Sequence, residues 1–123
     1  MGKLSRTKGA NFERRLARWF SYLFNDRIFR QTDETQQGNR GDIRFEIPRG
    51  CAQGLQLVVQ AKHMRQPSIW AALAEAEKAC SDDATDLAVA CVRRHGGEDV
   101  VVMRPDVFAL LIAGIPRGWK DFV

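Results

Sequence analysis

Four side chains of this 123-residue chain have the chemistry and spacing to hold a metal ion beside a phosphate: Glu13, Asp42, Gln60 and Lys62. Gln60 and Lys62 are two residues apart in the strand-like run 55–62, and an extended backbone places such residues on the same face. Carboxylate and amide oxygens suit Mg²⁺ or Mn²⁺ as ligands. Because a lysine next to such an ion can bind a phosphate, these residue types indicate phosphodiester hydrolysis.

A bound divalent ion lowers the pKa of its water and neutralises charge that grows on a phosphate. Lys62 would position the attacking water or stabilise the negative charge that develops at phosphorus. Each residue can also have a purely structural role. Asp42 follows Gly41 and can be a turn residue, and Glu13 can pair with an arginine. A Gln-x-Lys pattern on one face of a strand is common. The four residues together are more specific than any one of them.

A helix over residues 10–24 is expected to position Glu13. A period of 3.6 residues places Glu13 between Phe20 and Phe24, within a wide apolar arc. That arc consists of Phe12, Leu16, Trp19, Phe20, Leu23 and Phe24. A carboxylate inside a buried arc is costly unless it has a partner, which favours a functional reason for Glu13. Arg14, Arg15 and Arg18 fall on the opposite side, where solvation and DNA contact are equally consistent.

The other elements follow from periodicity and turn residues. We expect a strand over 28–31, a polar loop over 32–40, and a hairpin of strands over 42–47 and 55–63. A helix over 67–80 then crosses over to a buried strand over 87–92, followed by a strand over 99–103 and a helix over 105–114. This order predicts an α/β fold with a mixed sheet, as one domain over 1–123. Residues 1–9 are interpreted as a flexible basic arm, and 115–123 as a tail that can dock on a surface.

Basic residues are concentrated in one half of the chain. Residues 1–65 hold 13 Lys and Arg against 6 Asp and Glu, whereas residues 66–123 hold 6 against 9. Arginine, which can grip phosphate with two parallel donors, supplies 14 of the 19 basic residues. The asymmetry indicates one face turned to a polyanion. The alternative is a solvated surface that serves solubility.

The remaining composition narrows the class of protein. No apolar run approaches the roughly 20 residues of a membrane helix, and the basic start leads into no apolar signal core. Cys51, Cys80 and Cys91 lack the paired spacing of a zinc site. We therefore expect an intracellular (cytoplasmic) protein with reduced thiols, Cys80 and Cys91 lying in the core.

Three short motifs resemble those of the PD-(D/E)xK nuclease superfamily. They are Lys8-Gly9…Glu13-Arg14, Gly41-Asp42, and Gln60-Ala61-Lys62. The resemblance spans roughly residues 8–93 and is greatest to the archaeal-type Holliday junction resolvases and their phage relatives. It implies a restriction-endonuclease-like αβββαβ core, with the last strand and helix as additions. It also implies a homodimer that nicks branched DNA, such as a four-way junction. The small size of the domain suits an enzyme that is encoded by a phage and acts in a bacterial host.

The resemblance also assigns roles. Asp42 and Gln60 would contact Mg²⁺ or Mn²⁺, Glu13 would do so directly or through a water, and Lys62 would act on the phosphate. The departure is Gln60, where the family usually has glutamate; relatives of the Mrr kind carry Gln-x-Lys and still cut. We expect weaker metal affinity, because one negative charge is missing. Candidate phosphate contacts bordering this site are Lys8, Arg30, Arg40 and Arg65. His63 should face away from Lys62.

Other functions stay open at this point. A restriction- or repair-type nuclease of the same fold would act on ordinary duplex, although the chain has no room for a target-recognition domain. A catalytically inactive nucleic-acid-binding module would share the basic face. A small RNA-associated protein would explain the arginines, but it would not explain a carboxylate at Glu13 within an apolar arc.

Overall fold

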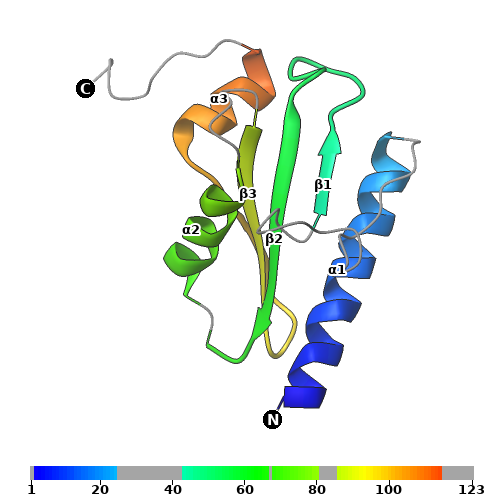
Figure 1. The fold of residues 1–123 in the computed structure, drawn as a ribbon, viewed down its shortest axis with the longest axis vertical. Helices are drawn as coiled ribbons and strands as arrows, with labels where there is room; N and C mark the ends of the chain where they lie inside the picture. The colour runs from blue at the N-terminus through cyan, green and yellow to red at the C-terminus, as the bar shows by residue number, and fades with distance from the viewer. Residues whose placement is uncertain (1, 25–42, 67, 81–85, 115–123) are drawn as a thin grey trace.

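The computed structural model describes residues 2–24, 43–66, 68–80 and 86–114, with side chains described from residue 9 onward. Its elements, drawn in Figure 1, are α1 (Gly2–Phe24), β1 (Ile43–Glu46), β2 (Gln56–Met64), α2 (Ile69–Ala79), β3 (Asp86–Arg94), β4 (Asp99–Val102) and α3 (Pro105–Ala113). Their order confirms the predicted α/β class. The strand expected over 28–31, the loop over 32–40 and the tail over 115–123 lie outside the described residues.

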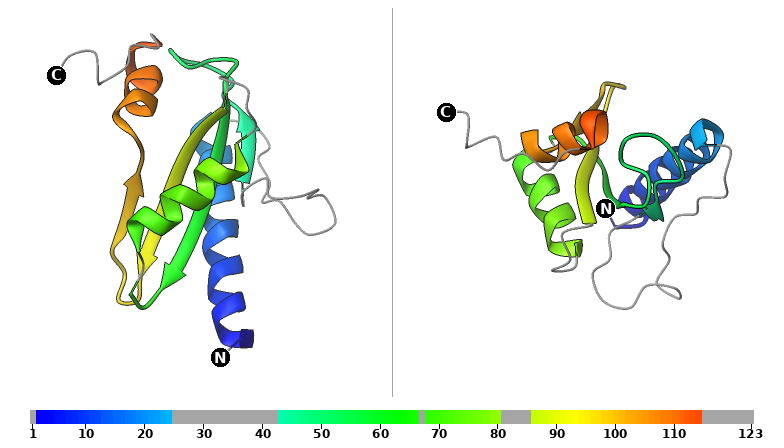
Figure 2. Two further views of the ribbon diagram at one scale, coloured as in Figure 1. Left: turned by 60° about the vertical axis from the view of Figure 1, so that its left-hand side comes forward. Right: turned by 90° about the horizontal axis from the view of Figure 1, so that it is seen from above.

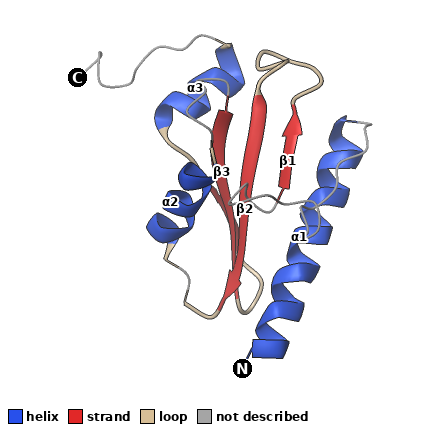
Figure 3. Ribbon diagram, viewed as in Figure 1, coloured by secondary structure: helices blue, strands red, loops and turns tan. Residues whose placement is uncertain are grey.

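The described strands form one mixed sheet in the order β1-β2-β3-β4 (Figure 3). β1 and β2 are antiparallel, which confirms the hairpin. β2 and β3 are parallel and are connected through α2, as the expected crossover requires. β4 returns antiparallel to β3 and lies at the edge of this sheet. β3 is buried along most of its length, in agreement with the apolar pattern that predicted an inner strand.

Helices α1 and α2 cover opposite faces of the sheet (Figure 2). Side chains alternate between the two faces of a strand, so each strand contributes to both layers. On the α1 face, Phe12 and Phe20 belong to a hydrophobic cluster with Ile43, Phe45 and Val59. On the α2 face, a smaller cluster consists of Ala72, Ala90 and Val92. The alternation in β2 therefore decides which of its polar residues lies beneath which helix.

Helix α1 differs from its prediction in two respects. It begins at Gly2 rather than near Ala10, so the expected flexible arm over 1–9 is wrong for residues 2–9. Gly9 costs only about 1 kcal/mol relative to alanine inside a helix, and the helix continues through it. Trp19 and Leu23, expected in the apolar arc, are 50% and 48% exposed. The apolar arc of α1 is wider than the surface that the sheet covers, because the sheet contacts only the part of the helix centred on Phe20.

Helix α2 lies close to the sheet because its inner side chains are small. Ala72, Ala76 and Ala79 are buried there, and alanine both favours helix and permits close approach. The helix begins after Ser68, whose Oγ accepts a hydrogen bond from the backbone N–H of Ala71 at 3.2 Å. At its other end, Cys80 is half-buried.

Helix α3 closes the end of the sheet that also carries the β1–β2 turn (Figure 1). It ends at Gly114, which has a φ of 69° and therefore adopts the left-handed conformation that glycine tolerates best. A Cβ at Gly114 would lie 2.7 Å from the backbone oxygen of Cys51 in that turn. This close approach explains why glycine stands at the position.

The cysteines are free thiols, as expected. Cys91 is buried in the core, Cys80 is half-buried and Cys51 is exposed. Burial raises the pKa of the Cys91 thiol to about 12, with a smaller contribution from Asp99. Cys91 is therefore protonated at neutral pH and acts as a packing residue.

An ion pair between α2 and the start of α3 predicts a small pH-dependent stabilisation. Arg104 donates from Nε and Nη2 to the two carboxylate oxygens of Glu77, at 2.8 and 3.0 Å. These hydrogen bonds hold the pKa of Glu77 below its ordinary value of 4.5. The pair therefore stabilises the fold above that value, and the contribution is lost as the pH falls through the lowered pKa.

We expect Arg104→Gln to lower the free energy of unfolding slightly at pH 7, because the two side chains are 51% and 37% exposed and solvent screens the pair. Urea denaturation over a series of pH values from 7 downward measures the difference. The difference should disappear as the pH falls through the lowered pKa of Glu77 and its carboxylate is protonated. A loss of equal size at every pH would show that the arginine acts through packing instead.

Candidate functional site

Gln60 and Lys62 lie on the face of β2 that α2 covers. Their neighbours in the strand, Val59 and Ala61, belong to the hydrophobic cluster on the other face. Gln60 is the buried polar residue of the described core, with 8% exposure. Its Oε1 atom is buried and accepts no hydrogen bond from the described residues. A buried amide oxygen left unpartnered costs about 1–3 kcal/mol, so it marks a position where a ligand is expected.

Lys62 reaches toward α2 and forms an ion pair there. Its Nζ lies 2.8 Å from Oε2 of Glu75, and the two side chains are 30% and 45% exposed. A pair this open to solvent contributes only about 0–1 kcal/mol to stability. The ammonium group is therefore held near Gln60 by a contact that a competing anion can displace.

Asp42 lies outside the described residues. The first described residue of β1, Ile43, pairs with Val59, which precedes Gln60 in β2. Beyond Ile43, no described strand pairs with β2 on the β1 side. The proximity of Asp42 to Gln60 stays a prediction from the sequence.

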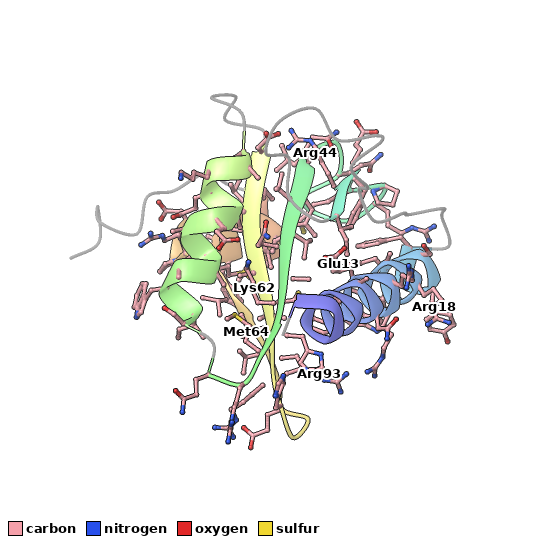
Figure 4. All side chains as sticks on the ribbon, turned by 60° about the horizontal axis from the view of Figure 1, so that its bottom comes forward. Glu13, Arg18, Arg44, Lys62, Met64 and Arg93 are labelled. Carbon is pink, nitrogen blue, oxygen red and sulfur yellow. The ribbon has the colours of Figure 1, made fainter. Side chains whose placement is uncertain are left out.

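Glu13 is half-buried on α1 and does not share the face of Gln60 and Lys62. Figure 4 shows Glu13 on the α1 side of β2 and Lys62 on the α2 side. The structure therefore brings Gln60 and Lys62 together but separates Glu13 from them by the sheet.

The candidate phosphate contacts are described only in part. Arg65 is exposed just after the end of β2, Lys8 lies in α1 with no side chain described, and Arg30 and Arg40 fall outside the described residues. Arg15 and Arg18 are exposed on α1. Within the described residues, neither these two arginines nor Arg65 forms an ion pair with a carboxylate. These guanidinium groups are free to meet an external anion.

His63 faces away from Lys62, as its position in the strand predicted. Its ring meets Phe12 of α1 edge-on at 6.1 Å and His95 of the β3–β4 turn at 5.1 Å, measured between ring centroids. The guanidinium of Arg93 lies 5.8 Å from the centre of the Phe12 ring and pairs with Asp99 at 2.9 Å. His63 therefore belongs to the packing between α1 and the sheet.

The residues present fit a divalent cation in part. Among residues outside the undescribed segments, no group of three or more His, Cys, Asp or Glu side chains is placed to hold a metal. The amide of Gln60 is a different kind of ligand, and its oxygen is buried and unpartnered. Glu75 adds a carboxylate beside Lys62 on the same face. The described oxygen donors on this face are therefore one amide and one carboxylate, the ligand type that Mg²⁺ and Mn²⁺ prefer.

Glu75 is the residue that sequence reasoning missed. The apolar spacing of Ile69, Leu73, Ala76 and Cys80 predicts the inner face of the second helix and leaves Glu75 at the margin of that face. Residues three and four apart share a helix face, and Glu75 lies three residues after the buried Ala72. That spacing was the available signal. Only the packing of α2 on β2 shows that the carboxylate meets Lys62.

A separate cavity of about 360 Å³ lies between α1 and β4. It is lined by Phe12, Arg15, Leu16, Trp19, Cys91, Asp99, Val100 and Val101. Most of these side chains are apolar, and the cavity is on the α1 side of the sheet. It is therefore distinct from the polar site at Gln60, and its carboxylate, Asp99, is paired with Arg93.

Comparison with models of protein families, with curated proteins and with solved structures found no match to this chain. No helix among the described residues is long and apolar enough to cross a membrane. The fold and the candidate site define an α/β protein with a mixed sheet, in which Gln60 and Lys62 lie on the face of β2 that α2 covers.

Proposed function

We propose that this protein is a metal-dependent endodeoxyribonuclease that cuts branched DNA, most specifically a Holliday junction. The observation that carries the proposal is the buried, unpartnered Oε1 of Gln60 on the same strand face as Lys62. A fold gains nothing by burying an amide oxygen without a partner. A ligand that binds this oxygen would offset the cost of burying it.

Asp42 and Gln60 would hold Mg²⁺ or Mn²⁺, the roles that the sequence motifs imply, whereas Glu13 lies on the opposite side of β2 from Lys62. When bound, such an ion activates water and neutralises the charge that develops on the phosphate. The amide of Gln60 supplies an oxygen without a charge, so the affinity for the ion is expected to be modest. The low exposure of Gln60 excludes bulk water from this ligand.

Lys62 is the residue of this chain that meets the substrate phosphate. Its ammonium group stands on the same strand face as Gln60 and is partly exposed, so an incoming phosphodiester can reach it. A positive charge fixed at the place where negative charge develops stabilises the transition state. Because the Glu75 contact is weak, a phosphate can take the place of that carboxylate.

The charge pattern favours DNA as the substrate. Arg15, Arg18 and Arg65 are exposed cations without carboxylate partners in the described parts of the chain. Arginine binds phosphate through two parallel donors. By the sequence-based expectation, Lys8, Arg30 and Arg40 would extend this basic surface.

A second candidate is a nucleic-acid-binding module without catalysis. It is favoured by two facts: Gln60 is neutral where a carboxylate is usual, and Glu75 already neutralises Lys62. It would share the arginine surface and the fold. It differs in that binding would be indifferent to a divalent ion.

The test uses the purified full chain with labelled four-way junction, linear duplex and single strand, in Mg²⁺ or in EDTA. Paired symmetric nicks in the junction alone, dependent on Mg²⁺, are the expected result. Cutting of every duplex would instead assign a restriction- or repair-type nuclease. Junction binding without cleavage in Mg²⁺ or Mn²⁺ would favour the inactive module.

Paired nicks across a junction require two active sites, so the proposal includes a homodimer. β4 lies at the sheet edge, and its Val100 and Val101 are 49% and 54% exposed. Exposed apolar edge strands tend to pair with another chain. Two β4 strands meeting antiparallel about a two-fold axis would give a self-complementary interface.

We expect Val101→Lys to convert the dimer to a monomer, because it would bury an unpaired charge at the two-fold contact. Size-exclusion chromatography with light scattering measures the mass. Phe108→Lys is the matched control, since Phe108 is 50% exposed on α3, away from β4. A monomeric unmodified chain, or a dimeric Val101→Lys variant, would rule out this interface.

A further inference from the structure

We propose that the cavity between α1 and β4 binds a small aromatic monocarboxylate, with Arg15 holding the carboxylate and the apolar lining holding the ring. The cavity measures about 360 Å³, and sites for small molecules typically measure about 300–1,000 Å³. Every residue that lines it is described, and it lies on the face of the sheet opposite Gln60 and Lys62. The cavity is therefore independent of the site proposed for DNA cleavage.

The floor and walls of the cavity are apolar. Phe12 and Cys91 are buried beneath it, and Leu16 and Trp19 follow Phe12 on the same face of α1. Val101 faces α1 from β4, because it pairs with Cys91, which belongs to the hydrophobic cluster on the α1 face. The rings of Phe12 and Trp19 thus line the space in which an aromatic ligand can stack on them or meet them edge-on.

The rim of the cavity exposes apolar surface that such a ligand would cover. Trp19 on α1 and Val101 on β4 are 50% and 54% exposed. Both residues line the cavity, one from the helix and one from the strand. Because the removal of apolar surface from water is favourable, an apolar body between these two side chains is stabilised on both sides.

The charges at the cavity favour an anion over a neutral ligand. The charged residues of the lining are Arg15 and Asp99. The Oδ1 atom of Asp99 is already paired with Nε of Arg93 at 2.9 Å. Arg15 is exposed and forms no ion pair with a carboxylate in the described part of the chain. A guanidinium binds a carboxylate through two parallel N–H donors, so one carboxylate on the ligand complements the lining.

The experiment uses 2-naphthoate, which joins a two-ring apolar body to one carboxylate, and its neutral counterpart 2-naphthamide. Calorimetric titration of the full chain measures the affinity for each probe, and NMR follows the indole N–H signals. We expect saturable binding of 2-naphthoate that shifts the signal of Trp19. The signal of Trp70, which is exposed on α2 and does not line the cavity, should stay in place.

Three variants separate recognition of the charge from burial of the ring. Arg15→Gln should weaken 2-naphthoate binding by about tenfold, the typical effect of losing a hydrogen bond between charged groups, and should leave 2-naphthamide binding unchanged. Arg18→Gln is the matched control, because Arg18 is exposed on the same helix and does not line the cavity. Leu16→Trp fills the cavity and should weaken the binding of both probes. Circular dichroism and thermal unfolding establish that each variant is folded.

The proposal is overturned if 2-naphthoate does not bind saturably, or if Arg15→Gln binds it as the unmodified chain does. Equal weakening by Arg15→Gln and Arg18→Gln would show a general effect of charge and would also overturn the assignment. An affinity that falls as the protein concentration rises would assign the cavity to a second copy of the chain instead of a ligand. Junction cleavage tests the nuclease separately, so the failure of either proposal leaves the other standing.

Discussion

Replacing Lys62 with alanine is expected to reduce junction cleavage by about 10²- to 10³-fold or more while leaving the protein folded. The ammonium group is the cation on the Gln60 face of β2, and its side chain is 30% exposed, so truncation creates no buried cavity. Its ion pair with Glu75 is too exposed to contribute much to stability. The large effect should therefore appear in catalysis and not in the free energy of unfolding.

Single-turnover cleavage of a labelled four-way junction in Mg²⁺ measures this loss. Lys78→Ala is the matched control, because Lys78 is an exposed lysine in the last turn of α2. The control should cut at the rate of the unmodified chain. Equal cleavage by Lys62→Ala would refute the assignment of this lysine to the reaction, and equal losses in both variants would indicate a general effect of charge on DNA affinity.

Gln60→Leu is expected to change stability and activity in opposite directions. Leucine has a similar size and removes the buried oxygen that has no partner among the described residues. We expect the free energy of unfolding to rise by about 1–3 kcal/mol, the cost of leaving such a group unpaired. Because the same oxygen is the proposed metal ligand, cleavage should fall below detection.

Urea denaturation tests the change in stability, and junction cleavage in Mg²⁺ tests the loss of activity. Gln56→Leu is the control, since Gln56 is half-buried four residues earlier on the same face of β2. It should leave cleavage unchanged. Gln60→Glu should keep or raise activity, because it provides a charged oxygen at the same place. A Gln60→Leu protein that is destabilised and still cuts DNA would show that the amide serves packing alone.

Much of the fold follows from local sequence pattern. The alternation of Leu57, Val59 and Ala61 with Gln60 and Lys62 already separated the two faces of β2, and the structure confirms that separation. The hairpin, the crossover and the final helix were likewise predicted, from turn residues and apolar runs. These features depend on periods of two residues in strands and 3.6 residues in helices. Such periods can be recognised from residues that are close together in the sequence.

The start of α1 and the exposure of Trp19 were not predictable in the same way. Gly9 signals a break locally, yet the helix continues through it because the cost is small. Trp19 shares an apolar arc with Phe20, but the sheet is too narrow to cover both side chains. Which part of an apolar arc is buried depends on the partner surface, and that surface is formed by distant residues.

The α/β order of elements, the basic first half, and the shared strand face of Gln60 and Lys62 were predictable from local patterns in the chain. The positions of Glu13 across the sheet and of Glu75 beside Lys62 depend on how the helices pack on the sheet. The face on which a strand side chain lies is a local property of the backbone. Which helix covers that face, and which of its side chains reaches the strand, depends on packing between segments far apart in the chain.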